Sequence, residues 1–177
     1  METMLRAHKI RLYPNNIQQT YLNKACGVAR FAYNWALARA KELYEQDNSC
    51  RFNEAALRKE LNAIKAEQFP WMYEVTKCAP QLAIKNGLSS AFRSFFKGLA
   101  GFPRFHKKGV HDSFQLDNLN FRLEGEYISI PLLDRPIKMA EAFRYSDGKV
   151  LSATITRIAD HWYVRWPTLS TIKFRGQ

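Results

Sequence analysis

The first strand predicted in this chain has no β partner nearby in the sequence. Residues 4–13 combine apolar and cationic side chains in a strand-like run, and Pro14 ends it. The next strand-like runs begin only near residue 112, after a long stretch with helical periodicity. Because an unpaired strand leaves its backbone donors and acceptors unsatisfied, we expect residues 4–13 to pair with the C-terminal strands. The helical stretch is then an insertion into a β module.

Helical periodicity predicts three helices within the insertion. The first runs to about Gln46 and the second spans 53–66, each with an Asn at its N-cap. The third begins near Ala79 and stops at Gly98, a residue type that favours the end of a helix. Gly87 lies inside this third helix and weakens it slightly.

Short alternating runs separated by turn signals predict strands after residue 112. Asp147-Gly148 is a strong signal for a hairpin turn. The predicted fold class is therefore α+β, with a small antiparallel β-barrel-like module and three to four helices inserted after its first strand. The predicted strands are 114–116, 121–123, 127–131, 137–139, 143–145, 149–158 and 162–166.

Positive charge is concentrated in the middle of the chain. Between Glu74 and Asp112 there are seven cationic residues and no acidic one, and phenylalanines are interleaved with them. The whole chain has a formal net charge of +11. Such a run of positive charge with aromatic rings suits a polyanion that has stackable bases. The sequence therefore favours nucleic acid as the partner, and in particular RNA or locally opened DNA.

No recognisable catalytic or metal-binding pattern accompanies this charge. The histidines form no ligand pair, and the three cysteines form no C-x-x-C pair. The sequence has neither a Gly-rich phosphate loop nor a G-x-S-x-G elbow. We therefore expect no enzyme, no cofactor and no metal site. The carboxylates that could hold two metal ions, most of them beside turns or a strand start, are Asp112, Asp117, Asp134, Asp147 and Asp160.

The cellular location is predicted from the N-terminal residues, the lengths of the apolar stretches and the number of cysteines. The N-terminal residues contain no apolar segment of the kind that a signal peptide needs. No stretch approaches the roughly 18 uncharged apolar residues of a membrane span. The odd number of cysteines gives no disulfide framework. We expect a cytoplasmic protein without a membrane partner.

Four groups of residues are candidates for contacts with nucleic acid: cations of the first strand, a polar pair in the first helix, the start of the third helix and the basic loop after it. Lys77 and Gln81 lie four positions apart on one helix face, where Gln suits adenine and Lys suits guanine. The alternatives are solvated cations on an edge strand, a buried polar pair, a solvated helix face and a solubilising linker. The candidates are Arg6, Lys9, Arg11, Arg30, Asn34, Lys77, Gln81, Lys85, Arg104, His106, Lys107 and Lys108.

Several segments together resemble the TnpB proteins, which are transposon-encoded, RNA-guided DNA endonucleases. The order and spacing of these segments match over about residues 4–166. The segments are Lys9-Ile10-Arg11-Leu12-Tyr13-Pro14, Arg30-Phe31-Ala32-Tyr33-Asn34-Trp35-Ala36-Leu37, Val75-Thr76-Lys77-Cys78-Ala79-Pro80-Gln81, Ala91-Phe92-Arg93-Ser94-Phe95-Phe96-Lys97-Gly98, Pro103-Arg104-Phe105-His106-Lys107-Lys108-Gly109, Gly148-Lys149-Val150-Leu151-Ser152-Ala153-Thr154-Ile155-Thr156-Arg157 and Trp162-Tyr163-Val164.

The resemblance implies a wedge domain that is split by an inserted recognition domain. In that family the wedge domain holds the guide-RNA scaffold, and both domains together recognise a short motif on double-stranded DNA. Lys77 and Gln81 match positions that look like contacts to this motif. The implied segments are 1–14 for the first wedge strand, 15–100 for the recognition helices, 101–166 for the basic loop and the remaining wedge strands, and 167–177 for an atypical tail.

The family's RuvC-like nuclease has no counterpart among these residues. No D-x-G strand and no zinc-binding cysteines follow Trp166. The leading hypothesis is a nuclease-less chain that binds guide RNA, double-stranded DNA or both. A second hypothesis is one half of a split RNA-guided DNA endonuclease, whose RuvC active site another chain supplies. A third is a relic, or a regulator that acts through protein contacts.

Overall fold

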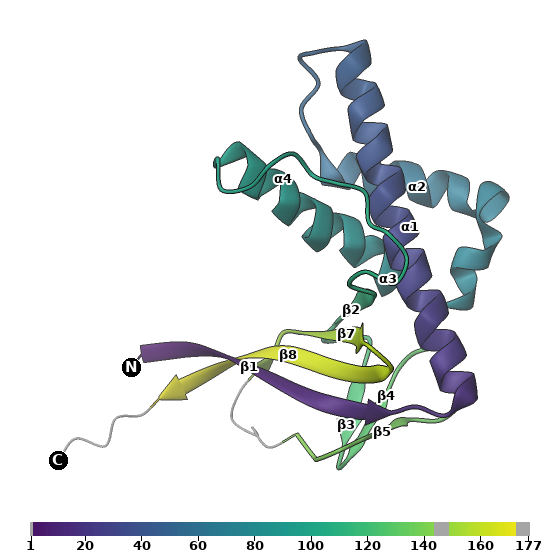
Figure 1. The fold of residues 1–177 in the computed structure, drawn as a ribbon, viewed down its shortest axis with the longest axis vertical. Helices are drawn as coiled ribbons and strands as arrows, with labels where there is room; N and C mark the ends of the chain where they lie inside the picture. Colours follow the sequence, from purple (N-terminus) through teal and green to yellow (C-terminus); the bar gives the residue numbers. More distant parts are fainter. Residues whose placement is uncertain (1, 144–148, 173–177) are drawn as a thin grey trace. The chain divides into compact units, whose positions relative to one another are not determined.

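The computed structural model describes the backbone of residues 2–143 and 149–172, and the side chains of 7–143 and 150–167. The chain divides into two compact units. The sheet unit consists of residues 1–22 and 115–177, and the helical unit consists of residues 23–114. A helical segment thus follows the first strand, and the remaining strands follow that segment (Figure 1). The predicted α+β fold class is confirmed.

The described strands form one antiparallel sheet. The neighbours across this sheet run in the order β2-β7-β8-β1-β5-β4-β3, and β6 pairs with β8. The first strand lies inside the sheet, between the C-terminal strand β8 and the short strand β5. The expected long-range pairing of the N-terminal strand is therefore confirmed. The strands are β1 (Glu2–Tyr13), β2 (Ser113–Asp117), β3 (Arg122–Glu124), β4 (Tyr127–Ser129), β5 (Ile137–Met139), β6 (Lys149–Val150), β7 (Ser152–Ile158) and β8 (His161–Ile172).

Alternation along β1 and β8 separates a buried face from an exposed one. Ile10 pairs with Val164 and Leu12 pairs with Trp162, and all four side chains are buried. Because successive side chains of a strand point to opposite faces, the residues between them face solvent. The buried face of the sheet includes Ile10, Leu12, Ile128, Ile137, Met139, Ala153, Ile155, Trp162, Val164 and Trp166.

Most strands differ from their predicted bounds by one or two residues at an end, and two of them differ more. The run predicted at 149–158 is interrupted at Leu151, which separates β6 from β7. The strand predicted at 162–166 continues to Ile172, because β8 remains paired with β1 as far as Glu2. Part of the expected tail is therefore strand. Phe143 lies outside any strand, and the rest of the run predicted at 143–145 and the Asp147-Gly148 turn lie outside the described residues.

The first turn of α1 (Asn16–Gln46) is fastened within the sheet unit. Asn15 is its N-cap, because the Asn15 side chain accepts a hydrogen bond from the Gln18 N–H at 2.9 Å. The Gln18 side chain accepts in return from the Asn15 N–H at 3.0 Å. The amide of Gln18 also donates to the carbonyl oxygens of Arg135 and Pro136. These bonds tie the first turn of α1 to the residues just before β5, within the sheet unit.

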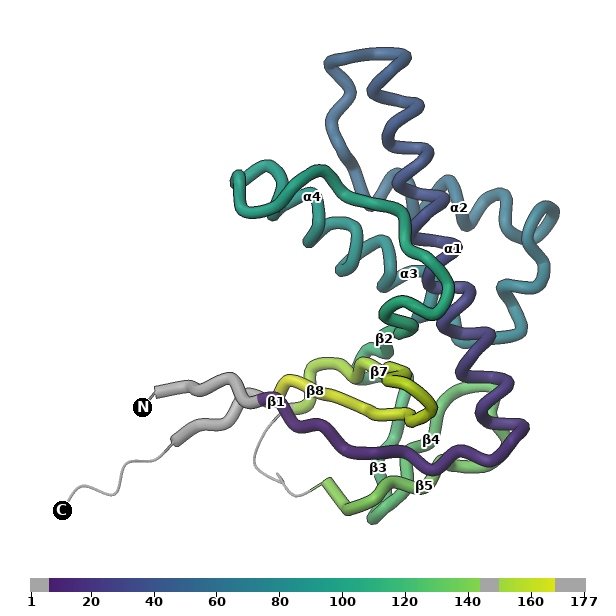
Figure 2. Tube along the Cα trace, viewed as in Figure 1, coloured from purple at the N-terminus to yellow at the C-terminus, as the bar shows by residue number. Residues whose placement is uncertain are grey.

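The helical unit packs the remainder of α1 against shorter helices (Figure 2). Asn53 caps α2 as predicted, with its side chain accepting from the Ala56 N–H. Ion pairing of Arg39 with Glu60 at 2.7 Å links α1 to α2. A short 3-10 helix that the sequence reasoning did not predict follows α2. The further helices are α2 (Glu54–Gln68), η1 (Pro70–Glu74), α3 (Cys78–Leu82), η2 (Ala83–Leu88) and α4 (Ser89–Phe96).

The predicted third helix is not a uniform α-helix. A π-helical segment, η2, separates α3 from α4 and contains Gly87. Glycine lowers the cost of this irregularity because it gains least from the regular α conformation. The predicted stop is confirmed, since Gly98 has φ of 71° just beyond α4. The Gly98 and Leu99 N–H groups donate to the carbonyl oxygens of Phe95 and Ser94, which is a Schellman motif.

Candidate nucleic-acid interface

The exposed side of the sheet carries cations and tyrosines together. The Lys9 ammonium lies 4.3 Å from the centre of the Tyr163 ring. Arg11 donates to Nδ1 of His161 at 3.0 Å, and its guanidinium carbon lies 5.1 Å from the Tyr13 ring centre. We call this surface the basic sheet face. It consists of Lys9, Arg11, Tyr13, Tyr127, Lys138, Tyr163 and Arg165.

Strand register brings these residues together from distant parts of the chain. Lys9 lies opposite Arg165, and Arg11 lies opposite Tyr163. Lys138 of β5 lies opposite Tyr13 on one side and Tyr127 on the other. Directly opposed residues of paired strands project from the same face, so the seven side chains share one surface. The result is a row of positive charge with aromatic rings between the charges.

Sequence reasoning found only part of the basic sheet face. Lys9 and Arg11 were predicted because they stand out as charges in an apolar strand. The predicted contact Arg6 lies in β1 opposite Thr168, but its side chain is outside the described residues. Tyr163 and Arg165 were missed, although they alternate with buried residues of the last strand. That alternation was the available signal.

A second basic surface is the loop that follows α4 in the helical unit. The Asn34 side chain donates to the His106 carbonyl oxygen at 2.9 Å and accepts from the His106 N–H at 2.8 Å. The His106 ring stacks on Tyr33, with the ring centres 3.8 Å apart and the planes inclined by 11°. An ion pair of 2.9 Å joins Arg30 to Asp112 near the end of the loop. Three side chains of α1 therefore hold the loop.

Within the loop, His106 and Asp112 contact α1, whereas several cations are exposed to solvent. We call residues 101–112 the basic loop, and its Arg104, Lys107 and Lys108 side chains are exposed. Partial burial, and then the charges of His111 and Arg30, lower the pKa of His106 below its usual value. Burial raises the pKa of the Tyr33 hydroxyl. The loop thus presents permanent cations beside a histidine that resists protonation.

The remaining candidates lie at the start and middle of the third helical segment. Lys77 is exposed at the N-cap of α3. The side chain of Gln81 is half-buried and donates to Oδ1 of Asn62 on α2 at 2.8 Å. Lys85 is exposed within η2. Lys77 and Lys85 are therefore accessible, whereas Gln81 already has one partner.

Three of the five candidate carboxylates have structural partners, and Asp147 lies outside the described residues. Asp112 pairs with Arg30, and Asp117 accepts from the Leu119 N–H. Asp160 lies 3.4 Å from Arg157 at a turn. Within the part of the chain that the structure describes, no group of three or more His, Cys, Asp or Glu side chains could hold a metal ion. No helix among those residues is long and apolar enough to cross a membrane.

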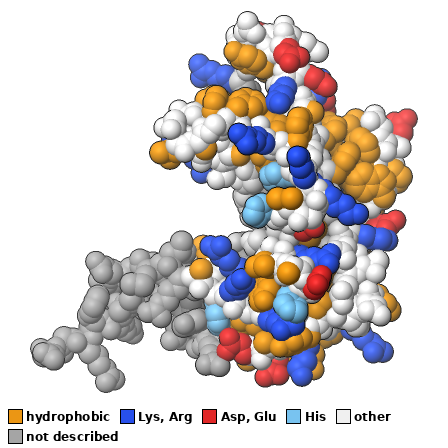
Figure 3. All heavy atoms as spheres, in the orientation of Figure 1, with side chains coloured by type: hydrophobic (Ala, Val, Ile, Leu, Met, Phe, Trp, Pro, Cys, Tyr) orange, Lys and Arg blue, Asp and Glu red, His pale blue; other side chains and the backbone are white. Residues whose placement is uncertain are grey.

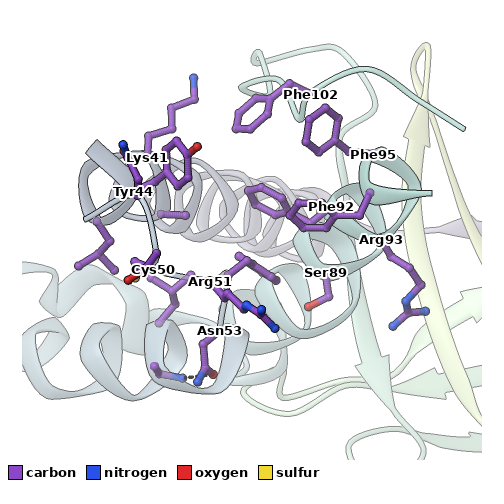
Figure 4. Close-up of a pocket in the computed structure, with 18 of the residues that line it drawn as sticks. Lys41, Tyr44, Cys50, Arg51, Asn53, Ser89, Phe92, Arg93, Phe95 and Phe102 are labelled. Atoms are coloured by element: carbon purple, nitrogen blue, oxygen red, sulfur yellow. Dashed lines mark hydrogen bonds between the residues drawn. The ribbon is translucent and has the colours of Figure 1, made fainter. Parts of the chain in front are cut away.

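A hollow of about 1680 Å³ lies within the helical unit. The end of α1, the start of α2 and the residues between them supply one part of its lining, and α4 with Phe102 supplies the other. Figure 4 shows the rings of Phe92, Phe95 and Phe102 gathered in it, with Lys41 and Tyr44 of α1 nearby. Figure 3 shows hydrophobic, cationic and acidic side chains interspersed on the face that it draws.

Comparison with known proteins gives relatives that are longer than this chain. Residues 1–49, which include β1 and α1, match a family model described as a helix-turn-helix domain, HTH_OrfB_IS605. The chain is 29% identical over 171 residues to "Putative RNA-guided DNA endonuclease InsQ" of Escherichia coli K12, covering 95% of this chain and 41% of that protein. It is 31% identical over 110 residues to "Putative RNA-guided DNA endonuclease" of Streptomyces pristinaespiralis, covering 61% of this chain and 27% of that protein. The chain thus spans less than half the length of either relative.

Proposed function

We propose, from the premise that this chain belongs to the TnpB family, that it binds nucleic acid through the basic sheet face and the basic loop. The observation that carries the proposal is the register of β1 with β8, which sets Lys9 opposite Arg165 and Arg11 opposite Tyr163. Cations spaced along paired strands can neutralise successive phosphates. The tyrosines between them offer rings on which unpaired bases stack.

Structured RNA is the ligand that this arrangement suits best. The guide RNA of the family is structured, and its loops expose unpaired bases beside closely spaced phosphates. The basic sheet face contains four cations, and one carboxylate, that of Glu124 opposite Tyr127, lies beside it. Arg104, Lys107 and Lys108 add exposed charge in the helical unit. We propose that the guide-RNA scaffold is the principal ligand of the sheet unit.

Duplex recognition is proposed for the start of α3. Lys77 is exposed there, and Gln81 lies one helical turn further on. A Lys and a Gln at a helix start can approach base edges in a groove, where Lys suits guanine and Gln suits adenine. On contact with a base, the Gln81 amide would either give up its hydrogen bond to Asn62 or keep it and use its other amide hydrogen and its oxygen for the base. K77A and Q81A should each relax the preference for the adjacent DNA motif without changing affinity for the guide RNA.

The test is a titration of the purified chain against the structured RNA encoded beside its gene, with an unrelated RNA as competitor, at two salt concentrations. The variant K9A/R165A removes two opposed charges from the basic sheet face. Its control, K59A/R135A, removes two exposed charges elsewhere. K9A/R165A should weaken binding. It should also reduce the slope of the logarithm of the binding constant against the logarithm of the salt concentration, by about 0.7 to 0.9 for each phosphate that the variant no longer neutralises.

Two outcomes would contradict the proposal. One is an equal loss of affinity in K9A/R165A and K59A/R135A, since the basic sheet face would then not be a specific surface. The other is an absence of binding to either RNA at low salt. Weak binding that is equal for both RNAs would leave only a generic polyanion surface, and would favour the relic or regulator hypothesis.

Assembly with a separate RuvC-bearing chain is the second candidate function. The observation that favours it is the position of β3, which ends the sheet and has a described partner only in β4. An open strand edge can pair with a strand of another chain. Co-purification of this chain with a RuvC fragment, compared with this chain alone, tests the idea. Failure of the two chains to associate during gel filtration would exclude it.

A further inference from the structure

The hollow in the helical unit is lined by a connected cluster of aromatic rings. Phe92 lies at its centre, with its ring centre 4.3 Å from that of Phe52, 5.9 Å from that of Phe96 and 5.6 Å from that of Phe102. Phe92 is buried, but 70% of Phe96 and 43% of Phe102 remain exposed. We call this hollow the aromatic groove. The cluster therefore presents ring surface to solvent although its centre is packed.

Positive charge surrounds the aromatic groove. Lys41, Arg51, Arg93 and Lys97 belong to its lining, against the carboxylates Glu45 and Glu60. Glu60 is already paired with Arg39. Among the described residues, no carboxylate forms an ion pair with any of the four cations. The groove thus combines exposed rings with cations that are available to a polyanion.

The aromatic groove is continuous with the basic loop. The Lys41 ammonium lies 5.3 Å from the ring centre of Phe102 and 4.8 Å from that of Phe105. Phe105 directly precedes His106, whose backbone Asn34 holds. A strand of nucleic acid that follows the exposed cations of the loop would therefore reach Phe102 and the groove without leaving positive surface.

We propose that the aromatic groove binds unpaired bases of a single-stranded nucleic acid segment, with Phe96 and Phe102 as stacking surfaces. This inference rests on the proposed nucleic-acid binding and adds a second site in the helical unit, separate from the basic sheet face. Base stacking on aromatic rings is tolerant of sequence, and surrounding cations hold the backbone. The occupant is single-stranded because bases inside a duplex already stack on one another.

A protein occupant fits the groove less well. The centres of protein interfaces are depleted in charged residues, and lysine is among the depleted types whereas arginine is enriched. The aromatic groove instead places two lysines, Lys41 and Lys97, among its lining residues. An acidic amphipathic peptide is the protein ligand closest in character, and a second copy of this chain is a further alternative. Both are measured below as competing outcomes.

The test compares a single-stranded and a duplex probe on the full chain. The probes are a labelled oligouridylate of about 10 nucleotides and a blunt RNA duplex, followed by fluorescence anisotropy. F96A removes the most exposed ring of the lining, and L99A removes an exposed apolar side chain outside it. We expect F96A to weaken oligouridylate binding about tenfold while L99A leaves it unchanged, with duplex affinity equal in both.

A second variant keeps the ring and reports on stacking. F96W places an indole at the exposed position, and stacked uracil should quench its fluorescence relative to the same titration of the unmodified chain. Equal oligouridylate affinity in F96A and in the unmodified chain, or an unquenched F96W, would overturn the proposal. If oligouridylate fails to bind while structured RNA binds, only the groove proposal fails. If neither binds, the proposed function fails as well.

The competing occupants have distinct signatures. A change in F96W fluorescence on addition of an acidic amphipathic peptide, without any change on addition of oligouridylate, would assign the groove to a protein partner and overturn the proposal. Self-association in sedimentation velocity that F96A abolishes, again without an oligouridylate signal, would assign the groove to a second copy of this chain.

Discussion

The side chain of Asn34 forms two hydrogen bonds with the backbone of His106, which lies 72 positions further along the chain. One bond uses the amide nitrogen as donor and the other uses the carbonyl oxygen as acceptor. Asparagine is suited to this arrangement because it carries both groups on one short side chain. The pair fixes the middle of the basic loop to α1.

Replacement of Asn34 by alanine should loosen the basic loop. Two largely exposed hydrogen bonds would be removed, so we expect a destabilisation of about 1 kcal/mol and a fall in Tm of about 2–4 °C. N118A, at an exposed asparagine in a turn, should leave Tm unchanged. Differential scanning calorimetry measures both. Equal Tm values for N34A and the unmodified chain would show that the two bonds do not stabilise the fold.

The order of elements could be predicted because it depends on long, regular patterns. The helix that ends at Gln46 and the Asn53 cap were predicted from periodicity and residue preference alone. The extension of the last strand to Ile172 could not be predicted, because it depends on pairing with β1 at the other end of the chain. The π-helical segment around Gly87 is equally a result of packing, since the sequence there has ordinary helical periodicity.

The candidate site, like the fold, could be predicted from the sequence only in part. Lys9 and Arg11 are visible in the sequence as charges within a strand. Their neighbours Tyr163 and Arg165 become neighbours only through a register that joins opposite ends of the chain. The ion pair of Arg30 is likewise invisible without the fold. Local patterns predicted residue types at the surface, but strand register and loop anchoring decide which of those residues act together.

Acidification should destabilise the protein partly through His106. Its pKa is lowered in the folded state by partial burial and by the charges of His111 and Arg30, so the unfolded chain takes up this proton first. The stabilising contribution is complete above the unfolded pKa of about 6.5 and is lost as the pH falls through that value. Below the lower folded pKa the loss becomes constant.

H106F isolates this contribution, because phenylalanine can stack on Tyr33 but does not titrate. Between about pH 7.5 and pH 5, Tm should fall further for the unmodified chain than for H106F. The two Asn34 bonds involve only the backbone of residue 106 and serve both proteins. Parallel Tm curves over this pH range would contradict the assignment.

The ion pair between Arg30 and Asp112 should contribute to stability and not to nucleic-acid affinity. Both side chains are largely withdrawn from solvent, with 22% and 15% exposed. R30M keeps the aliphatic stem, and D112N keeps an acceptor for the Gly109 N–H. Each single change should cost about 1–3 kcal/mol. Urea unfolding of both single variants and the double variant should give a coupling free energy of about 0.5–3 kcal/mol.

The same variants separate the structural role from a binding role. Since Arg30 is occupied by Asp112, R30M should leave the salt dependence of RNA binding unchanged, whereas R104A should reduce it by the equivalent of about one neutralised phosphate. A reduced salt slope in R30M, equal to that of R104A, would instead identify Arg30 as a residue that binds phosphate.

Replacement of Gly87 and of Gly98 by alanine should change the free energy of unfolding in opposite directions. At Gly87 a Cβ would lie 3.6 Å from Cδ2 of Tyr33, an ordinary van der Waals distance. Because alanine restricts the unfolded chain more than glycine does, G87A should raise the free energy of unfolding by about 0.4–1 kcal/mol. At Gly98 the φ of 71° disfavours any Cβ, so G98A should lower that free energy by about 1 kcal/mol although nothing lies within 4 Å. Chemical denaturation of both variants measures the difference. A destabilised G87A would show that the π-helical segment, and not backbone entropy, determines the preference for glycine at this position.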